Sequence, residues 1–117
     1  MIFVFGSNLS GRHGKGSALT ARKYYGAIYG RGVGPQGNSY AIPTKDYDMH
    51  TLPLRHIEDF VKEFLQYAKN NPDLIFNVTE IGCGLAGYTP EQIAPMFKRA
   101  SVNCKLPKSF KVILQSI

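Results

Sequence analysis

Apolar positions recur along the chain in two patterns, one typical of buried strands and one typical of amphipathic helices. Residues 1–5 are apolar without alternation, which predicts a central strand buried on both faces. Residues 54–69 place apolar side chains at helical spacing with charged side chains between them, and Asn-Asn-Pro follows at 70–72. This segment is the clearest helix that the pattern predicts.

Shorter segments add further elements. We expect a helix over residues 17–25 and strands over residues 40–42 and 74–79, with Pro43 ending the first of these strands or placing it at an edge. Residues 27–29 form an additional candidate strand within a glycine-rich loop.

The last part of the chain is expected to form one helix and one strand. Thr89, Pro90 and Gln92 form a capping box that predicts a helix to about Ala100, in which Pro95 should cause a kink or a later start. Residues 110–116 are expected to form a final strand. Strands therefore alternate with helices, which predicts an α/β fold: a three-layer α/β/α sandwich with a mixed, mostly parallel sheet.

Length and composition are typical of one domain, spanning residues 1–117, with 44% hydrophobic residues and 14 Phe and Tyr residues to fill a core. No stretch approaches the roughly 20 apolar residues of a membrane span. The apolar N-terminus lacks the features of a signal peptide.

Cys83 and Cys104 do not suggest a disulfide framework, so a reducing cytoplasm is the expected location. No His or Cys pair has zinc spacing, and we expect neither a metal nor a cofactor.

The net charge of +6 favours anionic partners, among them nucleotides, nucleic acid and acidic proteins. Ordinary solubility charge is an equal explanation, because no basic run exceeds two residues.

Two glycine-rich segments, residues 11–16 and 81–88, each follow an apolar run. A strand, a glycine-rich turn and a helix N-terminus together can bind an anion through backbone N–H groups. The glycines of either segment alone are better explained by tight turns. Two such segments in one small domain favour a ligand with two phosphates.

Several side chains near these segments are candidates for chemistry, each with a structural alternative. Lys45 follows a strand and is a candidate nucleophile or base, or else a solvated loop lysine. Asp46 and Asp48 are candidate carboxylate partners for it, or turn residues. Asn8 is suited to holding a ribose hydroxyl or to forming an Asx turn.

Three further residues lie in the glycine-rich segments themselves. His13 is placed to donate to a phosphate or to be exposed. Cys83 is either a reactive thiol or, more simply, a small buried side chain. Tyr88 is placed to cover a ligand or to fill the core.

Three motifs resemble the macrodomain superfamily of ADP-ribose-binding modules. They are His-Gly-Lys-Gly-Ser-Ala at 13–18, Tyr-Ala-Ile-Pro-Thr-Lys at 40–45 and Ile-Gly-Cys-Gly-Leu at 81–85. Their order and spacing are most similar to the branch of the terminal ADP-ribose protein glycohydrolase and of small phage and bacterial macrodomain-like proteins. The resemblance covers roughly residues 2–115.

The resemblance implies a three-layer fold with ADP-ribose bound across the carboxyl edge of the sheet. The residues expected to contact the ligand are Asn8, His13, Gly14, Lys15, Gly16, Gly82, Cys83, Gly84, Leu85, Ala86, Gly87 and Tyr88. Lys45 matches the lysine that attacks the distal ribose in the glycohydrolase branch.

One position departs from that branch. Its catalytic aspartate follows Gly-Cys-Gly-Leu, where this chain has Ala86. Acid–base groups commonly contribute about 10²–10⁴-fold to a rate, so the resemblance supports ADP-ribose binding more than hydrolysis. The expected partner is ADP-ribose or an ADP-ribosylated substrate. A nucleic-acid-binding module is a less favoured alternative because no RNP-like motif is present, and a non-catalytic interaction module is another.

Overall fold

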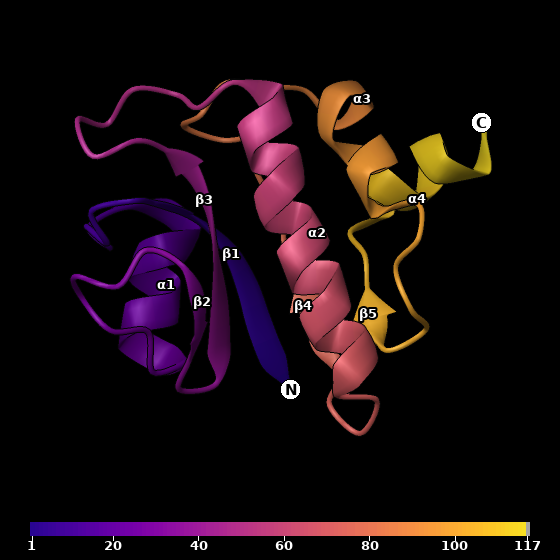
Figure 1. The fold of residues 1–117 in the computed structure, drawn as a ribbon, viewed down its shortest axis with the longest axis horizontal. Coiled ribbons are helices and arrows are strands. Elements are labelled where there is room, and N and C mark those ends of the chain that lie inside the picture. Colours follow the sequence, from indigo (N-terminus) through magenta and orange to yellow (C-terminus); the bar gives the residue numbers. More distant parts are fainter. Residues whose placement is uncertain (117) are drawn as a thin grey trace.

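The computed structural model describes residues 1–116 of the chain. Its strands are β1 (Ile2–Asn8), β2 (Gly34–Gln36), β3 (Ser39–Lys45), β4 (Phe76–Val78) and β5 (Cys104–Lys105). They form one sheet in the order β2-β3-β1-β4-β5 (Figure 1). Only β2 is antiparallel to its neighbour; the other three pairings are parallel. The expected α/β fold with a mixed, mostly parallel sheet is therefore confirmed.

Helices cover both faces of this sheet. They are α1 (Gly16–Tyr24), α2 (Leu54–Asn70), α3 (Pro90–Ile93), the 3₁₀ helix η1 (Ala94–Phe97) and α4 (Lys108–Gln115). Figure 1 shows α1 on the left beside β2, α2 crossing the middle of the sheet, and α3 and α4 on the right. Within the described residues, no helix combines the length and the apolar character that crossing a membrane requires.

The central strand explains why the layers form. Phe3 and Phe5 pack with Ala21 of α1 on one face, whereas Val4 between them joins the larger core on the other face, which contains Phe64 of α2. Successive strand side chains point to opposite faces, so a continuously apolar strand must be covered twice. The prediction of a strand buried on both faces is confirmed.

The predicted long helix is also confirmed. Helix α2 begins at Leu54, and its buried residues Ile57, Val61, Phe64 and Ala68 follow the expected spacing. Burial of this stripe against the sheet holds the helix in place, because propensity alone stabilises short helices weakly.

The edge of the sheet differs from the prediction. Residues 27–29 form no strand, and the antiparallel edge strand is β2 instead. Pro43 does not end its strand, since β3 continues to Lys45. The pairing of β2 with β3 stops at Ala41, so Pro43 has only β1 beside it. Proline has no backbone N–H, and on the β2 side no carbonyl at this position needs one.

The C-terminal prediction was wrong. Residues 110–116 do not form a strand, because Lys108–Gln115 is helix α4. Phe110, Ile113 and Leu114 have helical spacing, and all three pack on the α2 face of the core. The last strand is the two-residue β5, which precedes the helix.

The capping box was predicted correctly, but the helix after it is shorter. Thr89 and Gln92 make both capping interactions at the start of α3. The α-helix ends at Ile93, and the 3₁₀ helix η1, which contains Pro95, follows it directly. A proline in a helix interior removes a backbone donor, which accounts for the change of helix type.

Candidate functional site

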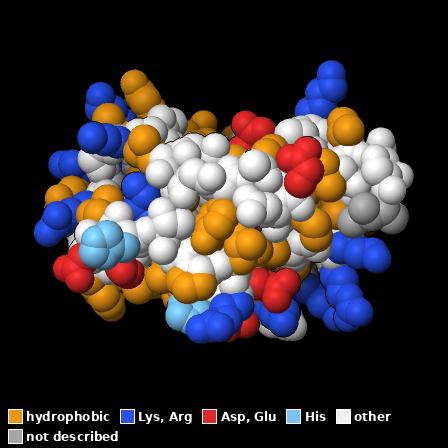
Figure 2. All heavy atoms as spheres, turned by 90° about the horizontal axis from the view of Figure 1, so that it is seen from above, with side chains coloured by type: hydrophobic (Ala, Val, Ile, Leu, Met, Phe, Trp, Pro, Cys, Tyr) orange, Lys and Arg blue, Asp and Glu red, His pale blue; other side chains and the backbone are white. Residues whose placement is uncertain are grey.

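A cleft of about 800 Å³ lies at the carboxyl-terminal edge of β1, β3 and β4. Its walls are the ends of β1 and β3 and the loops around residues 12–18 and 79–86. Figure 2 shows the molecule from above, the direction in which β3 points in Figure 1. Crevices at this edge are the usual ligand sites of open α/β sheets.

The first glycine-rich loop ends at the N-terminus of α1. Gly16, Ser17 and Ala18 form the first turn of this helix and line the cleft. The helix has no side-chain cap and no acidic residue in its first turn. Because the first N–H groups of a helix have no intrahelical acceptor, these amides are available to a ligand in the cleft.

The second glycine-rich loop leaves a further set of amides unused. Within it, Cys83 donates to Glu80 and Tyr88 donates to Gly82 through the backbone. Among the described residues, four amides of this loop have no acceptor, and all four residues line the cleft: Gly82, Gly84, Leu85 and Ala86. Both predicted loops therefore meet at one cavity, and each contributes lining residues whose amides have no acceptor among the described residues.

Gly82 shows why this loop needs glycine. Its φ is +77°, in the left-handed region, and a Cβ there would lie 3.1 Å from Cδ1 of Ile93. At Gly84 the backbone is ordinary, and a Cβ would meet no atom within 4 Å. Gly82 is thus required for the turn, whereas Gly84 leaves open space beside the cleft.

Two hydrogen bonds fix the second loop to the segment that follows β3. The Tyr88 hydroxyl donates to the Leu52 carbonyl at 2.7 Å, and the Thr51 hydroxyl donates to the Ala86 carbonyl at 3.0 Å. Tyr88 and Gly87 do not line the cleft. Tyr88 therefore supports the loop and does not contact the cleft.

Lys45 is the last residue of β3, and it lines the cleft with a half-buried side chain. The parallel pairing sets Lys45 beside Asn8 at the end of β1. Thr44, which precedes it, donates to the Ser7 carbonyl at 3.2 Å and is buried. Lys45 therefore lines the cleft beside the end of β1.

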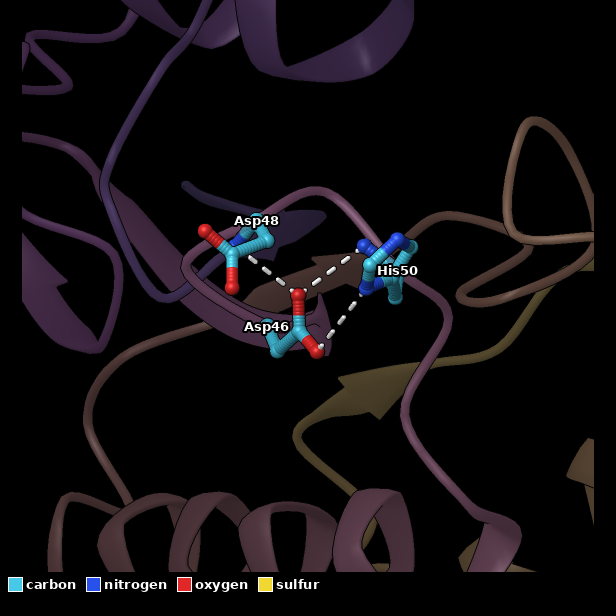
Figure 3. A group of neighbouring side chains, drawn as sticks. All are labelled: Asp46, Asp48 and His50. Carbon is cyan, nitrogen blue, oxygen red and sulfur yellow. Dashed lines mark hydrogen bonds and ion pairs between the residues drawn. The ribbon is translucent and has the colours of Figure 1, made fainter.

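Asp46 and Asp48 belong to the turn that follows and do not line the cleft. The Asp46 carboxylate accepts hydrogen bonds from the backbone amides of Asp48 and His50, both at 2.9 Å. It also lies 3.7 Å from Nδ1 of His50 (Figure 3). One oxygen or nitrogen atom from each of the three side chains lies within 4.8 Å of those of the other two, and Asp48 and His50 are exposed. This geometry is that of an Asx-stabilised turn.

His13 is not in the cleft. Its side chain is 0% exposed, and its Nε2 lies 2.9 Å from the carbonyl oxygen of Arg31. A carbonyl only accepts, so Nε2 carries the proton, while Nδ1 has no partner among the described residues. The imidazole ring packs edge-on against the Phe5 ring, with 5.3 Å between the two ring centres. His13 therefore fixes the loop instead of contacting a ligand.

Asn8 lines the cleft, but its amide is used by the turn. Its Oδ1 accepts from the backbone N–H of Arg12 and from the Ser10 hydroxyl, both at 2.8 Å. Its Nδ2 donates to the Arg12 carbonyl at 3.0 Å. The side chain thus shapes the start of the first glycine-rich loop, as an Asx turn does.

Cys83 lines the cleft as a neutral thiol. Burial, followed by the negative charges of Glu80 and Glu91, raises the pKa of Cys83 to about 11. Because the thiolate is the reactive form, this environment opposes the reactive-thiol interpretation.

The charges on the cleft lining are mainly positive. Arg12, Lys15 and Lys45 line it, against one carboxylate, Glu80. The Glu80 carboxylate accepts a hydrogen bond from the Ser109 hydroxyl at 2.5 Å, which ties it to the start of α4. An anion in the cleft would therefore meet an excess of cations.

No protein-family model matches the chain, and no curated protein matches its sequence.

Sequence reasoning missed several lining residues, among them Arg12, Tyr29 and Glu80, whose side chains are charged or aromatic. Tyr29 comes from the loop after α1, which has no motif to mark it. The chain approaches the first loop there because the Gly30 amide donates to the Gly11 carbonyl at 2.8 Å. Glu80 directly precedes the second glycine-rich segment, and this position in the sequence was the one signal that could have identified it as a lining residue.

Proposed function

We propose that this chain binds ADP-ribose or a related ADP-ribosyl nucleotide in the cleft. The observation that carries the proposal is the meeting of two sets of free backbone donors. One set is the first turn of α1, and the other is the loop of residues 82–86. Two adjacent anion cradles suit the two phosphates of a diphosphate.

Size and charge support the same class of ligand. The cleft volume of about 800 Å³ lies in the range of about 300–1,000 Å³ that is usual for cofactor and small-molecule sites. The excess of cations on the lining favours a ligand with negative charge.

The choice of ADP-ribose among nucleoside diphosphates rests on the resemblance to macrodomains. The three motifs that carry it are far apart in the sequence, at 13–18, 40–45 and 81–85. Residues from each of them line this one cleft. A motif set that assembles at one cavity is better support for a shared ligand than any one motif.

Hydrolysis is the second part of the proposal, with Lys45 as the nucleophile. A neutral lysine amine would attack the anomeric carbon of the distal ribose. The C–N bond forms as the C–O bond to a carboxylate breaks, and the electron pair leaves with that carboxylate. Water then displaces the lysine in a second step.

This chemistry needs a group that takes the lysine proton. Ala86 has no such group, and the Asp46 carboxylate is occupied by the turn. Among residues 1–116, Glu80 is the only carboxylate on the lining, and it is hydrogen-bonded to Ser109. We therefore propose binding as the main function and expect any hydrolysis to be slow, by about 10²–10⁴-fold relative to a site with a positioned acid–base group.

Calorimetric titration with ADP-ribose tests the proposal. ADP is the informative control, because it offers the two phosphates without the distal ribose. Binding of ADP-ribose that exceeds the binding of ADP supports the proposal, and an absence of heat with either nucleotide refutes it.

A further inference from the structure

The charge of the chain is divided unevenly between its two parts. Residues 1–45 contain six Lys and Arg and no Asp or Glu. In residues 46–117, eight Lys and Arg balance eight Asp and Glu. The whole net charge of +6 thus belongs to the segment that forms β1, α1, β2 and β3.

These cations gather on one end of the molecule. Figure 1 places α1 and β2 at the left, and Figure 2 shows several Lys and Arg side chains at that end, with others at the opposite end. Five of them are exposed, and we call them, together with Tyr24 and Tyr29, the α1 surface: Arg12, Lys15, Arg22, Lys23 and Arg31. Among residues 1–116, the one ion pair within 4 Å joins Asp46 and His50, so none of these five cations is neutralised by a carboxylate.

Aromatic rings lie among the cations. Tyr29 is 55% exposed and Tyr24 is 76% exposed, although neither is needed to fill the core. The guanidinium of Arg22 lies 4.9 Å from the centre of the Tyr29 ring. Tyr29 also lines the cleft together with Arg12 and Lys15, so the α1 surface is continuous with the mouth of the cleft.

The loop that carries Tyr29 is fixed in place. The Arg31 carbonyl accepts from buried His13, and the Ser7 hydroxyl donates to the Gly32 carbonyl at 2.5 Å. A Cβ at Gly32 would lie 2.0 Å from the carbonyl oxygen of Asn8, so the loop passes closely over the end of β1. The ring and its cation are therefore presented on a supported backbone.

We propose that the α1 surface binds single-stranded nucleic acid across the mouth of the cleft. Unpaired cations bind the phosphates, and exposed tyrosine rings, one of them with an arginine beside it, stack on bases. An acidic peptide would use the cations but would leave the exposed rings without a function. The proposal does not depend on ADP-ribose binding.

The test is fluorescence anisotropy with a labelled single-stranded thymidine oligonucleotide of about 12 nucleotides, within the usual range of site sizes. With about four phosphates neutralised, affinity should fall roughly 50-fold between about 50 and 200 mM salt. The double variant Arg22→Gln, Lys23→Gln should bind at least about tenfold more weakly, because it removes two of the phosphate-binding cations. Tyr29→Leu should also weaken binding by about tenfold, through lost stacking.

The matched control is Lys108→Gln, Lys111→Gln on α4, which removes the same charge from exposed positions outside the α1 surface. It should keep most of the affinity. Equal loss in both double variants, no binding at low salt, or tighter binding of a polyglutamate peptide than of the oligonucleotide would each overturn the proposal.

ADP-ribose titration of the Arg22→Gln, Lys23→Gln variant separates this surface from the cleft. Neither residue lines the cleft, so ADP-ribose affinity should stay unchanged. Thermal unfolding of each variant confirms that it folds, and Tyr29→Leu should be tolerated because the ring is exposed.

Discussion

The Tyr88 hydroxyl donates a 2.7 Å hydrogen bond to the carbonyl oxygen of Leu52. This bond joins the second glycine-rich loop to the chain that follows β3. Four residues of the loop line the cleft and have amides without an acceptor among the described residues, so the positions of these amides depend on how firmly the loop is held.

Removing that hydroxyl should loosen the loop. Tyr88→Phe leaves a partly buried carbonyl without its donor, which should lower the free energy of unfolding by about 1 kcal/mol. Urea denaturation measures the change. Tyr47→Phe is the control, since Tyr47 is 66% exposed and its hydroxyl should contribute nothing measurable. Equal effects of the two substitutions would show that the Tyr88 bond does not hold the loop.

Gly82 and Gly84 should respond differently to the same substitution. Gly82→Ala places a Cβ at positive φ and 3.1 Å from Ile93, which should destabilise the fold by about 1–2 kcal/mol. Gly84→Ala meets no atom and should change stability by less than about 0.5 kcal/mol. Chemical denaturation measures the free energy of unfolding of the two variants. A Gly82→Ala variant as stable as the wild-type protein would contradict the loop geometry.

The Cys83 thiol should be slow to react. Burial and the neighbouring Glu80 and Glu91 raise its pKa from 9.0 to about 11, so little thiolate exists near neutral pH. Alkylation by iodoacetamide, followed by mass spectrometry across a pH series, should show the rate rising toward pH 11. Glu80→Gln should lower the pKa and speed alkylation at pH 9.

The raised pKa of Cys83 also determines how the free energy of unfolding should change with pH. Between about pH 9 and pH 11 the unfolded chain loses the thiol proton while the folded chain keeps it. The unfolded state then binds fewer protons, so the free energy of unfolding should fall as the pH rises through this window, and Cys83→Ala should reduce that fall. An unchanged pH dependence in the variant would exclude Cys83 as its source.

Lys45→Ala separates binding from turnover. It should abolish release of ADP-ribose from an ester-linked carboxylate, because the nucleophile is missing. Affinity for ADP-ribose should stay within a few-fold, since backbone amides supply the phosphate contacts. Release is followed chromatographically with wild-type protein as the reference. A Lys45→Ala variant with full turnover would show that another group carries the reaction.

The sequence predicted elements well where a pattern had one explanation. The helix of residues 54–70 has apolar spacing that fits only a helix, and the capping box at Thr89 is a local signal that depends on nothing distant. The two glycine-rich loops were found as well, because glycine at a strand end is informative in an α/β chain. Their meeting at one cleft follows from the parallel strands, whose carboxyl ends share one edge.

The failures have equally particular causes. Residues 110–116 were predicted to form a strand, but the segment is a helix that packs Phe110, Ile113 and Leu114 against the core. The burial of His13 depends on a carbonyl 18 residues away, which no local pattern shows. Asn8 was not such a failure, because its hydrogen bonds with Arg12 are those of the Asx turn that the sequence offered as an alternative to ribose binding.

Calorimetric titration with ADP-ribose is the most direct test of the central claim, that the two loops form one diphosphate site. Wild-type protein should bind ADP-ribose in the micromolar range and bind AMP more weakly. Gly84→Val should fold normally, because the position has open space, but should bind at least about tenfold more weakly, since its side chain blocks amides whose hydrogen bonds to a charged group are worth about 1.5–3 kcal/mol. Absence of binding to the wild-type protein, or undiminished binding to Gly84→Val, would contradict the account.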